Sequence, residues 1–245
     1  MPSPSETFIQ DFHKKNPGCT TVAFLDGQVR DGVNSYDYLS DLLVPTNDFQ
    51  TVVDLGCGDG ILLKKILEKN LPNLKLIGID MSIGELDLAR KHLGTDKITF
   101  LEANAQALPL PDESVDYIFC HLAFMLMENI EQVVCEIHRC LKPNGIFSAV
   151  VGGKSEFSPI LKSFLRLLEK ALRDDNKGDL PPLGDQRTKS SEGLKSLFTD
   201  ANFSDVQVSD FRVNFCAPPE SLINYFMLMY DVGLLSGTSR VELSA

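Results

Sequence analysis

Short runs of branched apolar residues alternate with longer amphipathic segments through the middle of the chain. The apolar runs predict β-strands near residues 51–55, 74–79, 97–101, 115–120 and 145–150. Apolar residues that recur every three to four positions predict helices near residues 60–69, 82–93 and 129–141. Strands that alternate with helices through short connections form a parallel sheet with helices on both faces. The pattern therefore predicts an α/β, doubly wound fold.

Two helix starts carry a specific polar signature. Ser3 and Glu6 have the spacing of a capping box, in which each side chain bonds the other residue's backbone N–H, so a helix is expected over residues 3–14. Ser82 and Glu85 repeat this spacing where the second central helix should begin. Both pairs are interpreted as local helix-starting devices.

The flanking regions contain further elements. One helix is expected to begin at Ser35, another after Ser158, and a third near residues 190–201. The apolar segments 206–208 and 212–215 lie too close together for a crossover helix between them. We therefore expect them to form an antiparallel or bent pair of strands.

Composition restricts the class of protein. The chain has 245 residues, enough for one domain with a substantial core, and a net charge of −11 argues against a nucleic-acid substrate. Its apolar residues are dispersed, and its N-terminus lacks the basic and apolar regions of a signal peptide, so no membrane span or secretion is expected.

The six cysteines contain no Cys-x-x-Cys pair and are expected to be reduced, as in a cytoplasmic protein. No His, Cys and carboxylate residues have the spacing of a metal site, so no metal is expected. His13, His92 and His138 are interpreted as structural or exposed residues.

The segment from Val52 to Gly60 carries the strongest chemical signal. Two β-branched residues and an acidic residue precede glycines at alternate positions, which predicts a buried strand, a tight turn and the start of a helix. The glycines allow the backbone to approach a ligand closely. Asp80 ends the next predicted strand, where an acidic residue binds the ribose hydroxyls of a nucleotide. Together these features predict a site for an adenosine-containing cofactor.

The spacing of the glycines restricts the kind of cofactor. A dinucleotide-binding turn reads Gly-x-Gly-x-x-Gly, but the third glycine here comes one residue early and Ile61 occupies the last position. A Walker phosphate-binding loop is excluded because no Gly-Lys-Ser/Thr follows.

Four ordered segments resemble the class I S-adenosylmethionine-dependent methyltransferases. They are Asp54 to Gly60, Gly78 to Ser82, Asn104 to Ile118 and Arg139 to Gly145. The resemblance covers residues 50–150 well, and it is strongest to small free-standing enzymes of the bacterial type, like the biotin- and ubiquinone-pathway methyltransferases. It implies a Rossmann-like sheet of seven strands, mostly parallel with an antiparallel last strand. It also implies transfer of a methyl group from S-adenosylmethionine to a small-molecule acceptor by in-line displacement, with S-adenosylhomocysteine as product.

The resemblance also suggests how the chain is organised. A single methyltransferase domain over residues 1–245 would contain a helical cap (1–48), a cofactor-binding core (49–151), a lid-like insertion (152–189) and a C-terminal part of the core (190–245). The sequence leaves open whether the protein is a monomer or a homodimer. Two alternatives also stay open: a non-catalytic protein that binds the cofactor, and a methyltransferase acting on a protein or RNA.

Cofactor-binding residues follow from the matched segments. The resemblance implies that Asp80 binds the ribose, that Met81 covers the adenine, and that Ala105 and Gln106 contact its ring. Asn104 departs from the family, which usually has Asp at this position to accept the adenine amino group. In the glycine-rich loop, the implied contacts are Asp54, Gly56, Cys57, Gly58 and Asp59.

Two further residues are candidates for a part in catalysis. His121 follows the fourth predicted strand and either acts as a general base or orients the cofactor. Tyr36 lies in the N-terminal segment that folds over the cofactor in the small-molecule branch of the family, where an aromatic residue closes the pocket. A core or surface role for Tyr36 is the alternative.

Overall fold

The structure is a computed structural model that describes residues 3–30, 32–153, 158–177, 180–215 and 218–244. Five parallel strands form its central sheet in the order β5-β4-β3-β6-β7. The strands are β3 (Gln50–Leu55), β4 (Leu74–Asp80), β5 (Ile98–Glu102), β6 (Val115–His121) and β7 (Leu141–Val150). These are the strands that the apolar runs predict, although β7 begins four residues earlier than the predicted 145.

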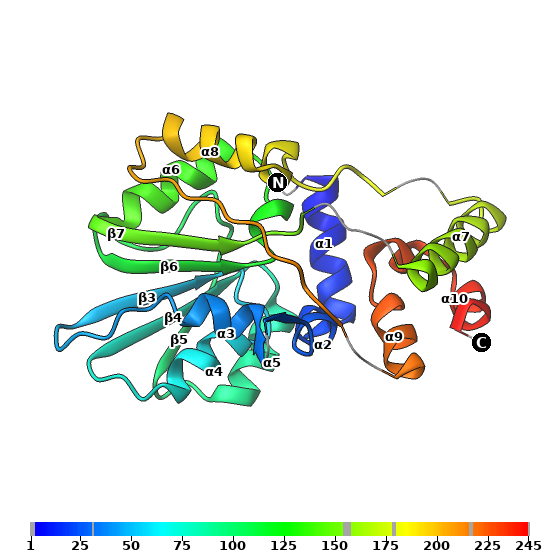
Figure 1. Ribbon diagram of the computed structural model, residues 1–245, viewed down its shortest axis with the longest axis horizontal. Helices are drawn as coiled ribbons and strands as arrows, with labels where there is room; N and C mark the ends of the chain where they lie inside the picture. Colours follow the sequence, from blue (N-terminus) through cyan, green and yellow to red (C-terminus); the bar gives the residue numbers. More distant parts are fainter. Residues whose placement is uncertain (1–2, 31, 154–157, 178–179, 216–217, 245) are drawn as a thin grey trace.

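Helices cover both faces of this sheet, as the alternating pattern predicts (Figure 1). Val52 of β3 packs on one side with α3 (Ser35–Ser40), α4 (Ile61–Glu68) and α5 (Ile83–Leu93). Its neighbour Val53 packs on the other side with α6 (Ile130–Cys140) and α8 (Ser191–Asp200). Successive side chains of a strand point to opposite faces, so a sheet covered on both sides needs apolar residues at consecutive positions.

The prediction of seven strands with an antiparallel last strand is wrong within the described residues. Segment 206–213 lies outside any strand, and Asn214 makes an isolated antiparallel bridge to Gln28, with backbone N–O distances of 2.9 and 2.8 Å. Nearby aromatic contacts hold the segment over the N-terminal part of the chain: the Phe211 ring lies 5.4 Å from Tyr38 and the Phe215 ring 6.1 Å from Phe24. The segment therefore ends against the N-terminal part of the chain, and none of its described residues pairs with a strand of the central sheet.

The N-terminal segment crosses the sheet edge at which the strands end. It comprises α1 (Pro4–Lys15), α2 (Cys19–Phe24) and a hairpin of β1 (Gln28–Arg30) and β2 (Val33–Asn34). In Figure 1 the arrows of β6 and β7 point toward α1. This segment therefore faces the carboxyl ends of the strands, where α/β proteins bind their ligands.

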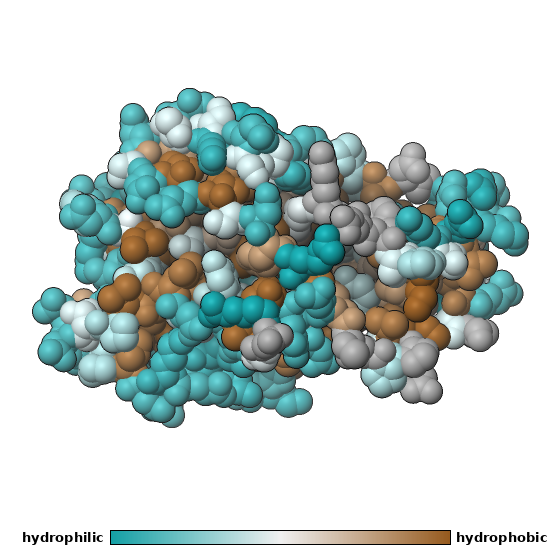
Figure 2. Space-filling view, viewed as in Figure 1, coloured by the Kyte–Doolittle hydropathy of each residue, from teal (hydrophilic) through white to brown (hydrophobic). Residues whose placement is uncertain are grey.

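A separate group of helices lies beyond α1 (Figure 1). It consists of α7 (Pro159–Asp174), α9 (Pro219–Phe226), η3 (Tyr230–Leu234) and α10 (Gly237–Ser244). Phe164, Leu168, Phe226 and Val232 form its own apolar core. We call this group the helical cluster. Apolar side chains also lie on its surface among hydrophilic ones, as Figure 2 shows. Two short helices complete the described elements, η1 (Phe124–Leu126) and η2 (Gln186–Lys189).

Within the described residues, none of the helices combines the length and the apolar character needed to cross a membrane.

Candidate functional site

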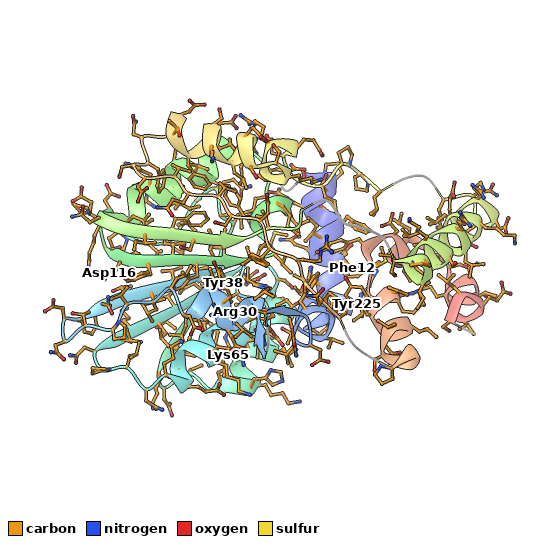
Figure 3. All side chains as sticks on the ribbon, viewed as in Figure 1. Phe12, Arg30, Tyr38, Lys65, Asp116 and Tyr225 are labelled. Carbon is orange, nitrogen blue, oxygen red and sulfur yellow. The ribbon has the colours of Figure 1, made fainter. Side chains whose placement is uncertain are left out.

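A cavity lies at the carboxyl edge of the sheet, between the strand ends and the N-terminal segment. Three of its polar residues end neighbouring strands or lie near their ends: Asp54 in β3, Asp80 in β4 and His121 in β6. Asp116, at the start of β6, lies at the opposite edge of the sheet (Figure 3). The predicted residues that line the cavity are Tyr36, Asp54, Gly56, Cys57, Gly58, Asp59, Asp80, Met81, Ala105, Gln106 and His121.

The glycine-rich turn forms the floor of this cavity. Gly56 has a φ of 72° and Gly58 one of 52°, values that side chains rarely permit. A Cβ on Gly56 would lie 2.4 Å from the Cβ of Ala123, so a side chain there would collide with the loop after β6. The backbone N–H groups of Gly56 and Cys57 both donate to the Ile79 carbonyl, at 2.7 and 3.0 Å. The turn is thus held against the end of β4.

Asp80 is oriented by backbone groups on both sides of the turn. Its Oδ2 accepts a hydrogen bond from the Gly58 N–H at 2.9 Å, and its Oδ1 accepts one from the Ser82 N–H at 2.8 Å. Burial raises the pKa of Asp80, while these two hydrogen bonds oppose the rise. Each carboxylate oxygen can accept more than one hydrogen bond. The carboxylate is therefore fixed in place and can still accept bonds from two hydroxyls.

Asp54 has a different environment. Its side chain is 1 % exposed, and Oδ1 has no hydrogen-bond partner among the described residues. Burial raises its pKa well above the usual range, and the neighbouring carboxylates of Asp80 and Asp59 raise it further. An unpaired buried carboxylate is costly and is stabilised by a cation or a hydrogen-bond donor. A ligand with a positively charged group fits this position.

His121 and Tyr36 are stacked at one wall, with ring centroids 3.7 Å apart. The Nε2 atom of His121 lies 2.8 Å from the Ser35 Oγ, whereas Nδ1 has no hydrogen-bond partner among the described residues. Burial lowers the pKa of His121 to about 3, so the ring is neutral near pH 7 and is a weak base. Burial raises the pKa of Tyr36, whose hydroxyl bonds the Thr21 side chain. Both rings are suited to shaping the wall.

The loop after β5 places its residues unequally. Ala105 is buried at the cavity, and Gln106 Nε2 donates to Glu6 Oε1 at 3.1 Å and to the Glu128 carbonyl at 2.8 Å. Asn104 is exposed and is not among the residues that line the cavity. The structure therefore brings together every predicted site residue except Asn104.

Several cavity residues were not predicted as site residues, among them His13, Glu85 and Tyr230. Glu85 is only 2 % exposed, and its Oε1 lies 2.7 Å from His13 Nδ1. Its Oε2 accepts a hydrogen bond from the Gly18 N–H at 2.9 Å. The second expected capping box is thus half formed: Ser82 Oγ accepts from the Glu85 N–H at 3.5 Å, but the carboxylate turns toward the N-terminal segment. The capping box at Ser3 and Glu6 is confirmed.

The pairing of His13 with a distant carboxylate explains why these residues were not predicted. Burial alone lowers the pKa of His13, but hydrogen bonds to Cys19 and Glu85 outweigh it and raise the pKa to about 12. His13 is therefore an imidazolium that pairs with the carboxylate of Glu85. The two residues lie 72 positions apart, so no local sequence pattern predicts the pair.

His13, Cys19 and Glu85 have ligand atoms within 4.8 Å of one another, a spacing that a metal ion could use. The hydrogen bonds from His13 and Gly18 already satisfy the Glu85 carboxylate without a metal ion.

Together, the parallel sheet, the glycine turn and the strand-end carboxylates are typical of α/β proteins that bind a nucleotide cofactor. Comparison with known proteins identifies the class more closely. Residues 53–149 match a family model described as "Methyltransferase domain". This part of the chain is therefore similar to methyltransferase domains, which matches the resemblance seen in the sequence.

Two curated relatives illustrate the match. The chain is 33 % identical over 123 residues to a malonyl-[acyl-carrier protein] O-methyltransferase of Methylococcus capsulatus, covering 50 % of this chain and 42 % of the relative. It is 33 % identical over 107 residues to a demethylmenaquinone methyltransferase of Symbiobacterium thermophilum, covering 42 % of this chain and 43 % of the relative. The chain thus spans less than half the length of either.

A solved structure shows the same fold over a longer stretch. It is a Thermotoga maritima protein described as "SAM-dependent methyltransferase, possible histamine N-methyltransferase". The two chains superpose with a TM-score of 0.54 at 20 % identity, covering 81 % of each. At this level of identity, the likeness establishes a shared fold.

Proposed function

We propose that the protein transfers a methyl group from S-adenosylmethionine to a small-molecule acceptor by in-line displacement. The observation that carries this proposal is the pair of carboxylates at the strand ends. The Asp80 carboxylate is held by two backbone N–H groups, and Oδ1 of the buried Asp54 has no hydrogen-bond partner among the described residues. Bound S-adenosylmethionine supplies a methyl group that its sulfonium makes electrophilic.

The floor residues suit the parts of this cofactor. Asp80 would accept hydrogen bonds from the ribose hydroxyls, and the unpaired Oδ1 of Asp54 would accept one from the ammonium group. Met81 and Ala105, which flank the adenine side in the family, both line the cavity. The exposed Asn104 would take no part in adenine binding in this arrangement.

The N-terminal segment would align the reactants and exclude water. Tyr36 is 3 % exposed, and His121 is 6 % exposed and neutral. Methyl transfer from a sulfonium depends mainly on proximity, alignment and a dry site. These rings would therefore hold the reaction geometry, and His121 would orient the cofactor in preference to removing a proton.

The charge of the cavity suggests a class of acceptor. Its lining contains five carboxylates, Glu6, Asp54, Asp59, Asp80 and Glu85, and within the described residues it contains no lysine or arginine. His13 is already paired with Glu85. Binding a free carboxylate, such as the malonyl group named for some relatives, would add to this negative charge. We therefore propose an acceptor that lacks a free carboxylate and whose nucleophilic group is neutral when it attacks.

Two measurements on the purified protein test these proposals. Calorimetric titration with S-adenosylmethionine and S-adenosylhomocysteine should show binding of both. S-Adenosylhomocysteine release should then be followed with aromatic acceptors of similar size that carry an amine, an imidazole, a phenol or a carboxylate. The amine, imidazole or phenol should be methylated in preference to the carboxylate. Turnover of the carboxylate alone would reject the acceptor class, and binding without turnover of any acceptor would support a non-catalytic cofactor-binding protein.

A further inference from the structure

One histidine joins three parts of the molecule at the cavity. His13, near the end of α1, places Nδ1 2.7 Å from Glu85 Oε1 on α5 and Nε2 2.9 Å from the Tyr230 hydroxyl on η3. Its side chain is only 14 % exposed. Both ring nitrogens are therefore used, one toward the core of the sheet domain and one toward the helical cluster.

Tyr230 gives the helical cluster its place in the cavity. Within the described residues, it is the one lining residue that lies beyond Met127 in the chain. Its ring packs edge-on against Phe12, with centroids 4.7 Å apart, and Figure 3 shows Phe12 where α1 meets the cluster. A Cβ on Gly233 would lie 2.8 Å from the Phe12 ring, so the backbone of η3 approaches α1 closely. Side-chain packing and a hydrogen bond thus fix Tyr230 together.

Glu85 links this joint to the cofactor-binding turn. The carboxylate is buried behind the turn, with Oε2 3.8 Å from the point where a Cβ on Gly58 would lie. The Gly58 N–H in turn orients Asp80. A change in the position of Glu85 would therefore be transmitted through Gly58 to Asp80, the residue that we assign to the ribose.

We propose that His13 is a positioning residue for methyl transfer: by docking between Glu85 and Tyr230 it holds the N-terminal segment and the helical cluster against the cofactor turn and completes the cavity wall. The inference rests on the proposed function, since it takes the cavity to be the cofactor site. Without His13, the buried Glu85 would lose one of its two partners and Tyr230 its link to α1. The helical cluster then acts on the cofactor through Tyr230, although most of it lies outside the cavity.

A double-mutant cycle tests this coupling. The variants are His13→Gln, Tyr230→Phe and the two combined. Gln is too short to reach both partners, and Phe keeps the ring that packs on Phe12. Matched controls are His138→Gln, on the exposed face of α6, and Tyr225→Phe, which lies in the helical cluster outside the cavity. S-Adenosylhomocysteine affinity is measured by calorimetry. Amide hydrogen exchange of α1 and η3 is measured with and without this ligand.

Coupled changes are expected. His13→Gln should weaken S-adenosylhomocysteine about tenfold and Tyr230→Phe about threefold, and the double variant should lose about tenfold in place of the roughly thirtyfold product, because both changes break one joint. Either variant should speed exchange in both α1 and η3, and the controls should do neither. His13→Ala removes both hydrogen bonds and should weaken binding at least as much as His13→Gln, so unchanged affinity in His13→Ala would overturn the proposal.

Other results of these measurements would also overturn the proposal. Affinities within twofold of the unmodified protein for both variants, or additive losses, would show that His13 stabilises the fold without positioning the wall. If the unmodified protein binds no S-adenosylhomocysteine, the proposed function fails. The contact between His13 and Tyr230 is then tested separately by amide hydrogen exchange in the free protein. Tyr230→Phe should still speed exchange in α1, and unchanged exchange would overturn the contact. A stoichiometric bound metal that Cys19→Ser removes would overturn the hydrogen-bonded joint in favour of a metal centre.

Discussion

The floor of the cavity, formed by the strand ends and the turn after β3, and its roof, formed by α1, α2 and Tyr230 of η3, are built in different ways. The main hydrogen bonds of the floor join Asp80 to Gly58 and Ser82, which are neighbours along the chain or across one strand pair. The roof is joined by His13 to Glu85 and to Tyr230, over 72 and 217 positions of sequence. Local sequence therefore determines the floor, whereas the roof depends on how distant segments dock.

The two parts also differ in charge. The floor supplies the carboxylates of Asp54, Asp59 and Asp80, and burial raises the pKa of each. The roof adds an imidazolium, but Glu85 neutralises it. The ionised forms of these three carboxylates are therefore disfavoured in the free protein and would be stabilised by a cationic cofactor, whereas the charges of the His13–Glu85 pair balance each other. Changes in the floor should act on affinity first, and changes in the roof should act on affinity and stability together.

Removing the Asp80 carboxylate should give the largest effect. Asp80→Ala deletes the acceptor proposed for both ribose hydroxyls. A hydrogen bond to a charged group is worth about 1.5–3 kcal/mol, so S-adenosylmethionine affinity should fall about ten- to hundredfold. Calorimetry measures this loss. Asp87→Ala, which removes an exposed carboxylate from α5, is the matched control and should bind normally. Equal losses in the two variants would point to a general electrostatic effect in place of a ribose contact.

Asp54→Asn should change affinity and stability in opposite directions. The folded-state pKa of Asp54 is raised, so its ionised form costs stability above the unfolded-state pKa. Removing the charge should raise the midpoint of thermal unfolding of the free protein by a few degrees, since about 1 kcal/mol shifts the midpoint of a chain this size by roughly 2–4 °C. The same change should weaken S-adenosylmethionine about three- to tenfold. Unfolding curves with and without cofactor show both effects, and a lower midpoint for free Asp54→Asn would contradict the account.

The sequence predicts the floor well because its signals are local. A strand, alternating glycines and an acid at the next strand end together suffice to place Asp54, Gly58 and Asp80 at one edge of a parallel sheet. The family resemblance adds Met81, Ala105 and the wall residue His121, all of which line the cavity.

The C-terminal strands and the roof were beyond prediction for physical reasons. The alternation in segment 206–215 is typical of a strand, but Phe211 and Phe215 pack on aromatic residues of the N-terminal segment, and packing overrides strand propensity. Glu85 fits a capping box by spacing, yet its carboxylate pairs with His13, and no pattern within ten residues of either predicts that pair.

The His13–Glu85 pair should make a pH-dependent contribution to stability. The folded-state pKa of His13 is about 12, above its ordinary value of 6.5. A raised pKa contributes stability that is complete below the unfolded-state pKa and declines as pH rises toward the folded-state pKa. The destabilisation caused by His13→Gln should therefore be largest near pH 6 and smaller at pH 9. Urea unfolding at the two pH values measures the difference, and His138→Gln is the control. Cys19 and Tyr230 also face His13, so Cys19→Ser at both pH values tests whether the thiol causes the trend. A difference that grows with pH would contradict the assignment.

The smallest effect is expected at Asn104, where the chain departs from the family. Asn104→Asp restores the family's usual residue, but the side chain is exposed and outside the cavity. Its effect on S-adenosylmethionine affinity should therefore stay within about twofold, as for most surface changes. Gln106→Ala is the informative comparison, because its amide joins the floor to Glu6 of the roof and to the Glu128 carbonyl. That variant should weaken binding by about threefold or more. If Asn104→Asp instead strengthened binding tenfold, residue 104 would have to turn into the cavity when the cofactor binds. The conformation of the floor would then depend partly on the ligand, and local sequence alone would no longer determine it.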